Sequence, residues 1–243
     1  MGGAPFALTV STNVHPYHHR YRTYVLYNGW VTTERRYAEL HAHSAFTFLD
    51  GTDEPARMVE EAARLGLDAL AILDVDGMYS TVQTTMAARA AGLPIVYGAE
   101  LTLTPDALRG IVPGTSAPGW GLAPGAEDPG MRLPILAASP SGYAHLVGAM
   151  SDRALSEPGQ RNPRHDLVNL SEAGGKLVVL TGGRRGPLMR ALRAGGSASA
   201  RRVLDGLVDA FGRDHVLVEW QAARGDEDEV GDVLAELARA SGT

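Results

Sequence analysis

The stretch from Tyr37 to Asp53 reads YAELHAHSAFTFLDGTD, and its pair His41 and His43 decides how the rest of the chain is interpreted. Side chains alternate along a β-strand with a period of two, so a strand that ends in His-x-His points both imidazoles to the same side. Asp50 follows after an apolar turn. Two imidazoles and a carboxylate suit a hydrolytic zinc, manganese or iron site, although two unrelated surface histidines would give the same short pattern.

The wider segment resembles the first motif of the PHP family, the polymerase and histidinol phosphatase domains. Further segments resemble later motifs of the family, in the same order and at about the same spacing. They read LGLDALAILDVDGMYS, AARAAGLPIVYGAELTL, LPILAASPSGYAHL and KLVVLTGGRRG. The resemblance covers roughly residues 37 to 240 and is strongest to the N-terminal PHP region of bacterial error-prone DNA polymerase III alpha-like subunits.

Composition restricts the class of protein. The chain has 243 residues, 44% of them hydrophobic, which is enough for one sizeable domain with a buried core. Its net charge of -6 lacks the basic surplus of proteins that bind nucleic acid strongly. The absence of cysteine leaves His, Asp and Glu as metal ligands and fits a cytoplasmic protein. No apolar run approaches the roughly 18 residues of a membrane span.

The chain divides into an irregular leader, residues 1–36, and one βα domain, residues 37–243. The leader gathers His15, His18 and His19 among tyrosines and arginines, so metal binding there is an alternative to a loosely docked, disordered segment. Residues 105–130 are rich in Pro and Gly, which predicts a surface loop inserted into the domain.

Strand-like and helix-like segments alternate from Tyr37 onward, which is typical of a parallel sheet or barrel with crossover helices. The expected strands are 38–41, 69–73, 95–104, 133–137, 177–181 and 216–220, and the expected helices are 54–65, 80–91, 141–153, 187–192, 197–211 and 227–240. With the resemblance, this predicts an α/β fold: a distorted, TIM-like βα barrel of the PHP class. The barrel apparently lacks its last strand, because the family's final Asp-x-His motif would fall beyond Thr243.

A barrel without one strand would leave two strands with unpaired N–H and C=O groups. Each unpaired buried group costs on the order of 1 to 3 kcal/mol. We expect the leader to cover this gap, with Tyr24-Val25-Leu26-Tyr27 as the covering strand.

Functional side chains of βα barrels lie just past the ends of the strands. The resemblance implies a set of metal ligands at such positions, namely His41, His43, Asp50 and Glu100. It also implies two carboxylates around them, Asp74 and Asp76. Arg184 and Arg185 are weaker candidates for holding a phosphate, and a solvated turn is the alternative.

Three positions depart from the family pattern. Val75 and Arg132 stand where the family has histidines, and Gly183 stands where many relatives have cysteine. A guanidinium cannot ligate a cation and would repel one. With the final motif also missing, about four or five of roughly nine ligands are lost, which should disable a multinuclear site. What survives could hold one divalent ion of zinc, manganese or iron, or none.

Two functions remain open. The resemblance implies the N-terminal PHP domain, truncated or stand-alone, of an error-prone DNA polymerase III alpha-like enzyme, in DNA replication or translesion synthesis. Such a domain would have no polymerase active site of its own, and its partners would be the rest of a polymerase or accessory proteins. The alternative is a stand-alone metal-dependent phosphoesterase that acts on small phosphate esters or DNA 3′ ends.

Overall fold

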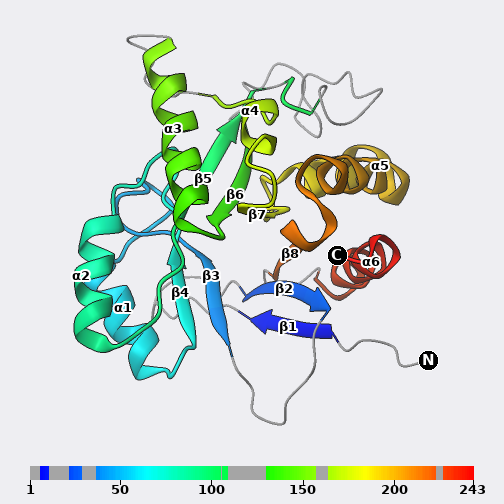
Figure 1. Ribbon diagram of the computed structural model, residues 1–243. Coiled ribbons are helices and arrows are strands. Elements are labelled where there is room, and N and C mark those ends of the chain that lie inside the picture. Colours follow the sequence, from blue (N-terminus) through cyan, green and yellow to red (C-terminus); the bar gives the residue numbers. More distant parts are fainter. Residues whose placement is uncertain are drawn as a thin grey trace.

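The computed structural model describes residues 37–104, 106–108, 130–156, 164–222 and 227–243, together with the backbone of two strands at 6–10 and 22–28. They form a mixed α/β fold (Figure 1). The strands are β1 (Phe6–Val10), β2 (Arg22–Asn28), β3 (Ala38–Ala42), β4 (Ala69–Ile72), β5 (Gly98–Leu103), β6 (Met131–Ala137), β7 (Leu177–Leu180) and β8 (Val216–Ala222). The helices are α1 (Pro55–Arg64), α2 (Thr81–Ala91), α3 (Pro140–Ser156), α4 (Val168–Ser171), α5 (Pro187–Phe211), the 3₁₀ helix η1 (Arg213–His215) and α6 (Glu227–Ser241).

Most expected elements are confirmed within a few residues at each end. The two helices expected at 187–192 and 197–211 are both contained in α5, which is interrupted at Gly195 and Gly196. Gly196 has a φ of 66°, a left-handed conformation that glycine adopts at no steric cost. The short helix α4 was not among the expected helices. Most of the expected surface loop at 105–130 lies outside the described residues.

The strands form a six-stranded sheet in the order β1-β2-β8-β7-β6-β5 and a pair β3-β4. The expectation of parallel strands throughout is wrong. Strands β3-β4 and β7-β8 are parallel, but β6 is antiparallel to both β5 and β7. Leu103 at the end of β5 pairs with Met131 at the start of β6, so the chain returns beside the strand it has just left. A parallel arrangement would instead require a crossover to the opposite end of the sheet.

Two strands lie within the leader, so it is not irregular throughout. Strand β1 pairs antiparallel with β2, and β2 pairs antiparallel with β8, with Tyr24 opposite Trp220 and Leu26 opposite Val218. The segment Tyr24-Val25-Leu26-Tyr27, which we nominated as a covering strand, lies inside β2. Strand β2 therefore supplies hydrogen-bond partners along one edge of β8.

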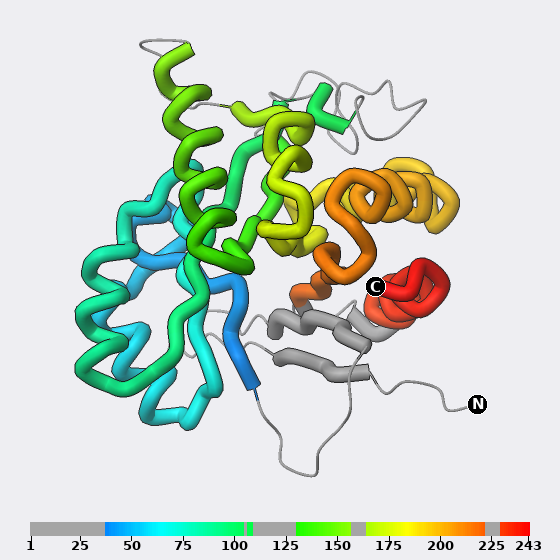
Figure 2. The backbone as a smooth tube through the Cα atoms, in the orientation of Figure 1, coloured from blue at the N-terminus to red at the C-terminus, as the bar shows by residue number. Residues whose placement is uncertain are grey.

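Alternation along β4 divides the core. Leu70 and Ile72 pack in a cluster with α1 and α2, whereas Ala71 and Leu73 face the other way and meet Leu136 and Leu180 from β6 and β7. Helices α1 and α2 lie side by side against β3 and β4, and α5 and α6 lie on the opposite side of the molecule (Figure 2). A strand buried on both faces holds its neighbours in a fixed register, which positions the site described below.

We predict that deletion of residues 1–30 destabilises the protein. The deletion removes β1 and β2 and leaves the backbone groups of β8 without their antiparallel partner, an exposed edge that invites association. Thermal unfolding and light scattering should show a lower midpoint and aggregation. Deletion of residues 1–5, which precedes both strands, is the control. A monomeric, cooperatively folding product with an unchanged midpoint would contradict this role of the leader.

His165 gives the fold a dependence on acid. It is buried beside Leu103, and burial, followed by the charge of Arg153, lowers its pKa to about 4. In the unfolded chain a histidine titrates near its ordinary pKa of about 6.5. Between these two values the unfolded chain binds more protons than the folded one, so the free energy of unfolding falls as the pH drops from 6.5 towards 4.

We predict that His165→Leu flattens this pH dependence. From pH 6.5 to 5, wild type should lose roughly 1–2 kcal/mol more of its unfolding free energy than the variant, measured by urea denaturation. His145→Gln, at a partly exposed histidine on α3 whose ring lies 2.9 Å from the Asn169 carbonyl, is the matched control and should behave as wild type. Equal pH slopes for wild type and His165→Leu would refute the assignment.

Candidate metal centre

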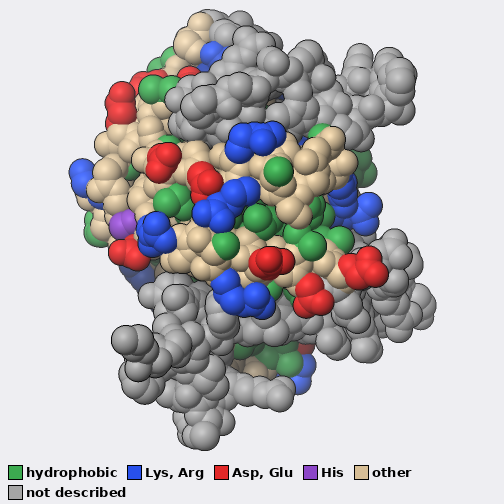
Figure 3. All heavy atoms as spheres, turned by 90° about the vertical axis from the view of Figure 1, so that its right-hand side faces the viewer, with side chains coloured by type: hydrophobic (Ala, Val, Ile, Leu, Met, Phe, Trp, Pro, Cys, Tyr) green, Lys and Arg blue, Asp and Glu red, His purple; other side chains and the backbone are tan. Residues whose placement is uncertain are grey.

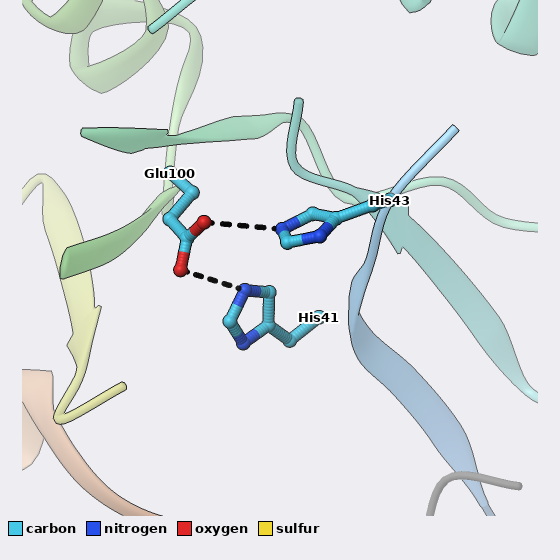
Figure 4. Close-up of side chains that lie close together, drawn as sticks. All are labelled: His41, His43 and Glu100. Carbon is cyan, nitrogen blue, oxygen red and sulfur yellow. Dashed lines mark ion pairs between the residues drawn. The ribbon is translucent and has the colours of Figure 1, made fainter. Parts of the chain in front are cut away.

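Three side chains that we expected to converge do lie together. His41 is in β3, His43 directly follows that strand, and Glu100 is in β5 (Figure 4). His41 Nε2 is 3.4 Å from Glu100 Oε1, and His43 Nε2 is 3.2 Å from Glu100 Oε2. One ligand atom from each residue lies within 4.8 Å of the other two.

Strand geometry explains the convergence. Period-two alternation places His41 and His43 on one side of the chain, with their ring centroids 5.1 Å apart and the rings nearly perpendicular. A parallel bridge between Val75 and Glu100 brings β5 beside the end of β4. The Glu100 backbone N–H donates to the Asp74 carbonyl, and the Asp76 N–H donates to the Glu100 carbonyl. The backbone therefore fixes the glutamate opposite the two rings.

The three residues fit one metal ion. The Nε2 atoms of His41 and His43 are buried and, among the described residues, face the Glu100 oxygens without forming a well-aligned hydrogen bond, which leaves room for a cation to bind them. Ligand atoms in a tetrahedral site with bonds of about 2.0–2.1 Å lie roughly 3.4 Å apart, close to the nitrogen–oxygen separations here. Two imidazoles and a carboxylate are donors that zinc, manganese and iron all accept.

Charge is concentrated around His41. Its Nδ1 lies 2.7 Å from Oε1 of Glu219, a fully buried residue of β8. Burial alone would lower the pKa of His41, but the carboxylates of Glu219 and Glu100 outweigh it and raise that pKa well above its ordinary value. Burial would raise the pKa of Glu100, but hydrogen bonding and charge from His41 and His43 hold it far below its ordinary value. Glu100 is therefore an ionised carboxylate in a buried site.

Glu39 is another buried carboxylate on β3. Burial raises its pKa to about 7, although it accepts hydrogen bonds from the His41 backbone N–H and the Tyr37 hydroxyl. Sequence reasoning missed both Glu39 and Glu219. The available signal was an acidic residue within an apolar strand, as Glu219 is within VLVEW, because such a residue is rarely buried without a partner.

Asp50 is not among the three converging residues. Its Oδ2 atom accepts a hydrogen bond of 2.6 Å from Arg132 Nη1, and the same Nη1 lies 3.4 Å from Glu100 Oε2. The guanidinium of Arg132 thus joins the two carboxylates. The resemblance implied both carboxylates as metal ligands. The positive guanidinium of Arg132 therefore lies directly beside the candidate site.

Asp74 and Asp76 accept hydrogen bonds from backbone N–H groups and hydroxyls rather than from the histidine rings. Asp74 is buried and accepts hydrogen bonds from Ser44, Thr47 and the Ser80 N–H. Asp76 accepts from the backbone N–H and the hydroxyl of Thr102. These contacts tie the loop after β3 and the loop after β4 to neighbouring elements.

The structure also shows which groups contact Val75, Gly183 and the arginine pair Arg184 and Arg185. The Val75 N–H donates to Thr47 Oγ1. Gly183 leaves room for Gln221, because a Cβ at position 183 would overlap the Gln221 amide. Arg184 and Arg185 are exposed, and Arg185 Nη1 is 3.6 Å from Asp50 Oδ2. A phosphate-binding role for these two arginines stays a prediction.

The fold and the buried cluster define an α/β domain with a candidate mononuclear metal centre. The chain belongs to the PHP domain family, whose model matches residues 39–223. The error-prone DNA polymerase of Mycolicibacterium paratuberculosis is 44% identical over 204 residues, which is 83% of this chain and 17% of the polymerase. That of Cutibacterium acnes is 42% identical over 206 residues, with the same coverage. The chain thus spans 17% of the length of these curated relatives.

Solved structures show weaker likeness. A protein from Bifidobacterium adolescentis, assigned as a metal-dependent phosphoesterase, has 19% identity and a TM-score of 0.35 over 84% of this chain and 75% of its own. An amidohydrolase from Chromobacterium violaceum has 20% identity and a TM-score of 0.33 over 49% of this chain and 34% of its own. Family membership rests on the domain match.

We predict that Asp74→Ala lowers the free energy of unfolding by at least about 3 kcal/mol, because several buried donors lose their acceptor. Urea denaturation in the presence of a chelator should show the full loss, since the contacts need no metal. Asp152→Ala, an exposed position on α3, is the control and should change stability by less than about 0.5 kcal/mol. A loss seen only when metal is supplied would indicate a ligand role for Asp74.

Proposed function

We propose that this chain is the PHP region of an error-prone DNA polymerase-like protein, in a replication or translesion-synthesis context, and that nucleotide transfer belongs to other parts of such a protein. The observation that carries this proposal is the 44% identity to an error-prone DNA polymerase, which extends over 83% of the chain. Identity at that level over a whole domain supports a shared role more strongly than a common fold does.

We also infer that the strands are arranged as a distorted barrel. Parallel bridges connect Leu70 with Ile95 and Val75 with Glu100, which links the β3-β4 pair to β5. Side chains of β3, β4, β6, β7 and β8 share one inner cluster that includes Leu40, Leu73, Leu136, Leu180 and Leu217. Strand β1 lies against β3. These contacts run around a common interior, as in a barrel whose core is filled by side chains.

His41, His43 and Glu100 would hold one divalent ion of zinc, manganese or iron. Such an ion supplies a Lewis acid and lowers the pKa of a water bound to it. Only some of the neighbouring side chains favour binding of a cation. The two imidazoles and the ionised Glu100 carboxylate provide donors, whereas Arg132 neutralises Asp50 and also approaches Oε2 of Glu100, the oxygen that faces His43. We infer a metal centre with fewer ligands than the family's, which contributes to folding or partner contacts more than to turnover.

A second candidate function is phosphoester hydrolysis by a stand-alone metal-dependent enzyme. It is favoured by the retained cluster, whose two buried imidazole nitrogens are without partners among the described residues. The arginines near Asp50 would suit an anionic substrate. Reading the genomic DNA beyond the codon for Thr243 separates the two functions. Sequence encoding a polymerase palm supports the first, and its absence supports the second.

The charge pattern bears on partners. On the face that carries α5 and α6, basic and acidic side chains are interspersed (Figure 3). The described part of this face (Figure 3) shows no continuous basic track of the kind that holds a nucleic acid backbone, and the whole chain has a net charge of -6. We propose that contacts with DNA are made by other parts of a polymerase or by accessory proteins. No helix in the described parts of the chain is long and apolar enough to cross a membrane.

We predict that the purified chain binds at most one zinc or manganese ion and hydrolyses phosphoesters only slowly. Val75, Arg132 and Gly183 provide no ligand where the family has one, so a multinuclear site should not assemble. Equilibrium dialysis measures the stoichiometry, and p-nitrophenyl phosphate and a DNA 3′ end serve as substrates. Val75→His alone should not restore turnover.

His43→Ala is the decisive control in that experiment. Robust metal-dependent turnover that disappears in His43→Ala would favour the stand-alone phosphoesterase over the single-ion centre with few ligands. Binding of one ion that is lost in His43→Ala, with slow turnover in both proteins, would support the proposal.

A further inference from the structure

Glu219 is a buried acidic residue that was not among the expected site residues. It lies on β8, 178 residues from His41 in sequence, and its Oε1 atom is 2.7 Å from His41 Nδ1. Its side chain is fully buried, and its Oε2 atom has no hydrogen-bond partner among the described residues. A carboxylate in such a place is costly because it has lost its contacts with water. Its presence therefore calls for a role that an apolar residue could not fill.

Contacts on two sides hold Glu219 in place. Its backbone N–H donates to Thr181 Oγ1 at 2.9 Å, which fixes β8 against the end of β7. The Gln221 amide Nε2 donates to Glu219 Oε1 at 3.0 Å. The Gln221 side chain in turn occupies the space left by the missing Cβ of Gly183. One departure from the family pattern therefore makes room for a group that orients Glu219.

Glu219 is not placed to be a ligand itself. It faces Nδ1 of His41, whereas Nε2 on the opposite edge of the ring faces Glu100. A metal-bound histidine usually donates its other ring N–H to a carboxylate or carbonyl, which fixes the tautomer and the orientation of the ring. The arrangement of Glu219, His41 and the candidate site has this form.

We propose that Glu219 is the positioning residue of the metal centre. It accepts the Nδ1–H of His41, so the Nε2 lone pair is directed toward the position shared with His43 and Glu100. The proposal rests on the single-ion site proposed above. It assigns a role to a residue of β8, which the His-x-His motif alone cannot identify.

The first test is zinc affinity, measured by competition with a chromogenic chelator. Glu219→Leu removes the acceptor at similar volume and should weaken zinc binding about 10- to 100-fold, as loss of such partners does elsewhere. Glu219→Gln keeps an oxygen acceptor and should lose less. Glu39→Gln is the matched control, because it alters a buried carboxylate on β3 that bonds the His41 backbone and not its ring. Its affinity should stay within about threefold of wild type, in line with an unchanged ring partner.

The second test needs no variant of Glu219. Long-range ¹H–¹⁵N correlation spectra of the zinc-loaded wild-type protein should show His41 protonated at Nδ1 and metal-bound at Nε2. The reverse assignment would overturn the proposal, even if the Glu219 variants fail to fold. Unchanged zinc affinity in a folded Glu219→Leu would overturn it while leaving the single-ion site intact. Absence of zinc binding by wild type would overturn both.

Discussion

The buried carboxylate of Glu100 is the constraint on which the site depends. A charge removed from water costs several kcal/mol unless partners compensate it, and this one is approached from two segments, by His41 and His43 at the end of β3 and by Arg132 of β6. The partners must therefore be fixed as firmly as the carboxylate. The fold achieves this through backbone hydrogen bonds between β5 and the loop after β4, and through the His-x-His end of β3.

The surroundings of Glu100 differ on its two sides. Oε1 faces His41, whereas Oε2 faces both His43 and Arg132. Toward Asp50, the guanidinium of Arg132 already supplies positive charge. Gln221, which occupies the space beside Gly183, similarly fills another region with a protein group. This distribution supports the proposed centre for one ion at His41, His43 and Glu100, with protein groups filling the regions beside it.

Sequence reasoning succeeded where the signal was local. The apolar runs of β4 and β7 were recognised from their short-range pattern, and the period of two along a strand placed His41 and His43 on one side of the chain. Glu100 was found through the family resemblance, which implies a metal ligand at this position of the expected strand 95–104. The direction of β6 was not found, since a strand pattern is the same whether its neighbours run parallel or antiparallel.

The sequence by itself determined most of the elements, the family and the pair of histidines, because these depend on periodicity and on motifs confined to short stretches. Only the tertiary structure decided that Arg132 joins Asp50 to Glu100 and that Glu219 faces His41. Residues 82 and 178 positions apart meet only when strands from distant parts of the chain pack around one interior. Such contacts leave no period in the sequence, since they depend on how buried charges find partners once the strands are in place.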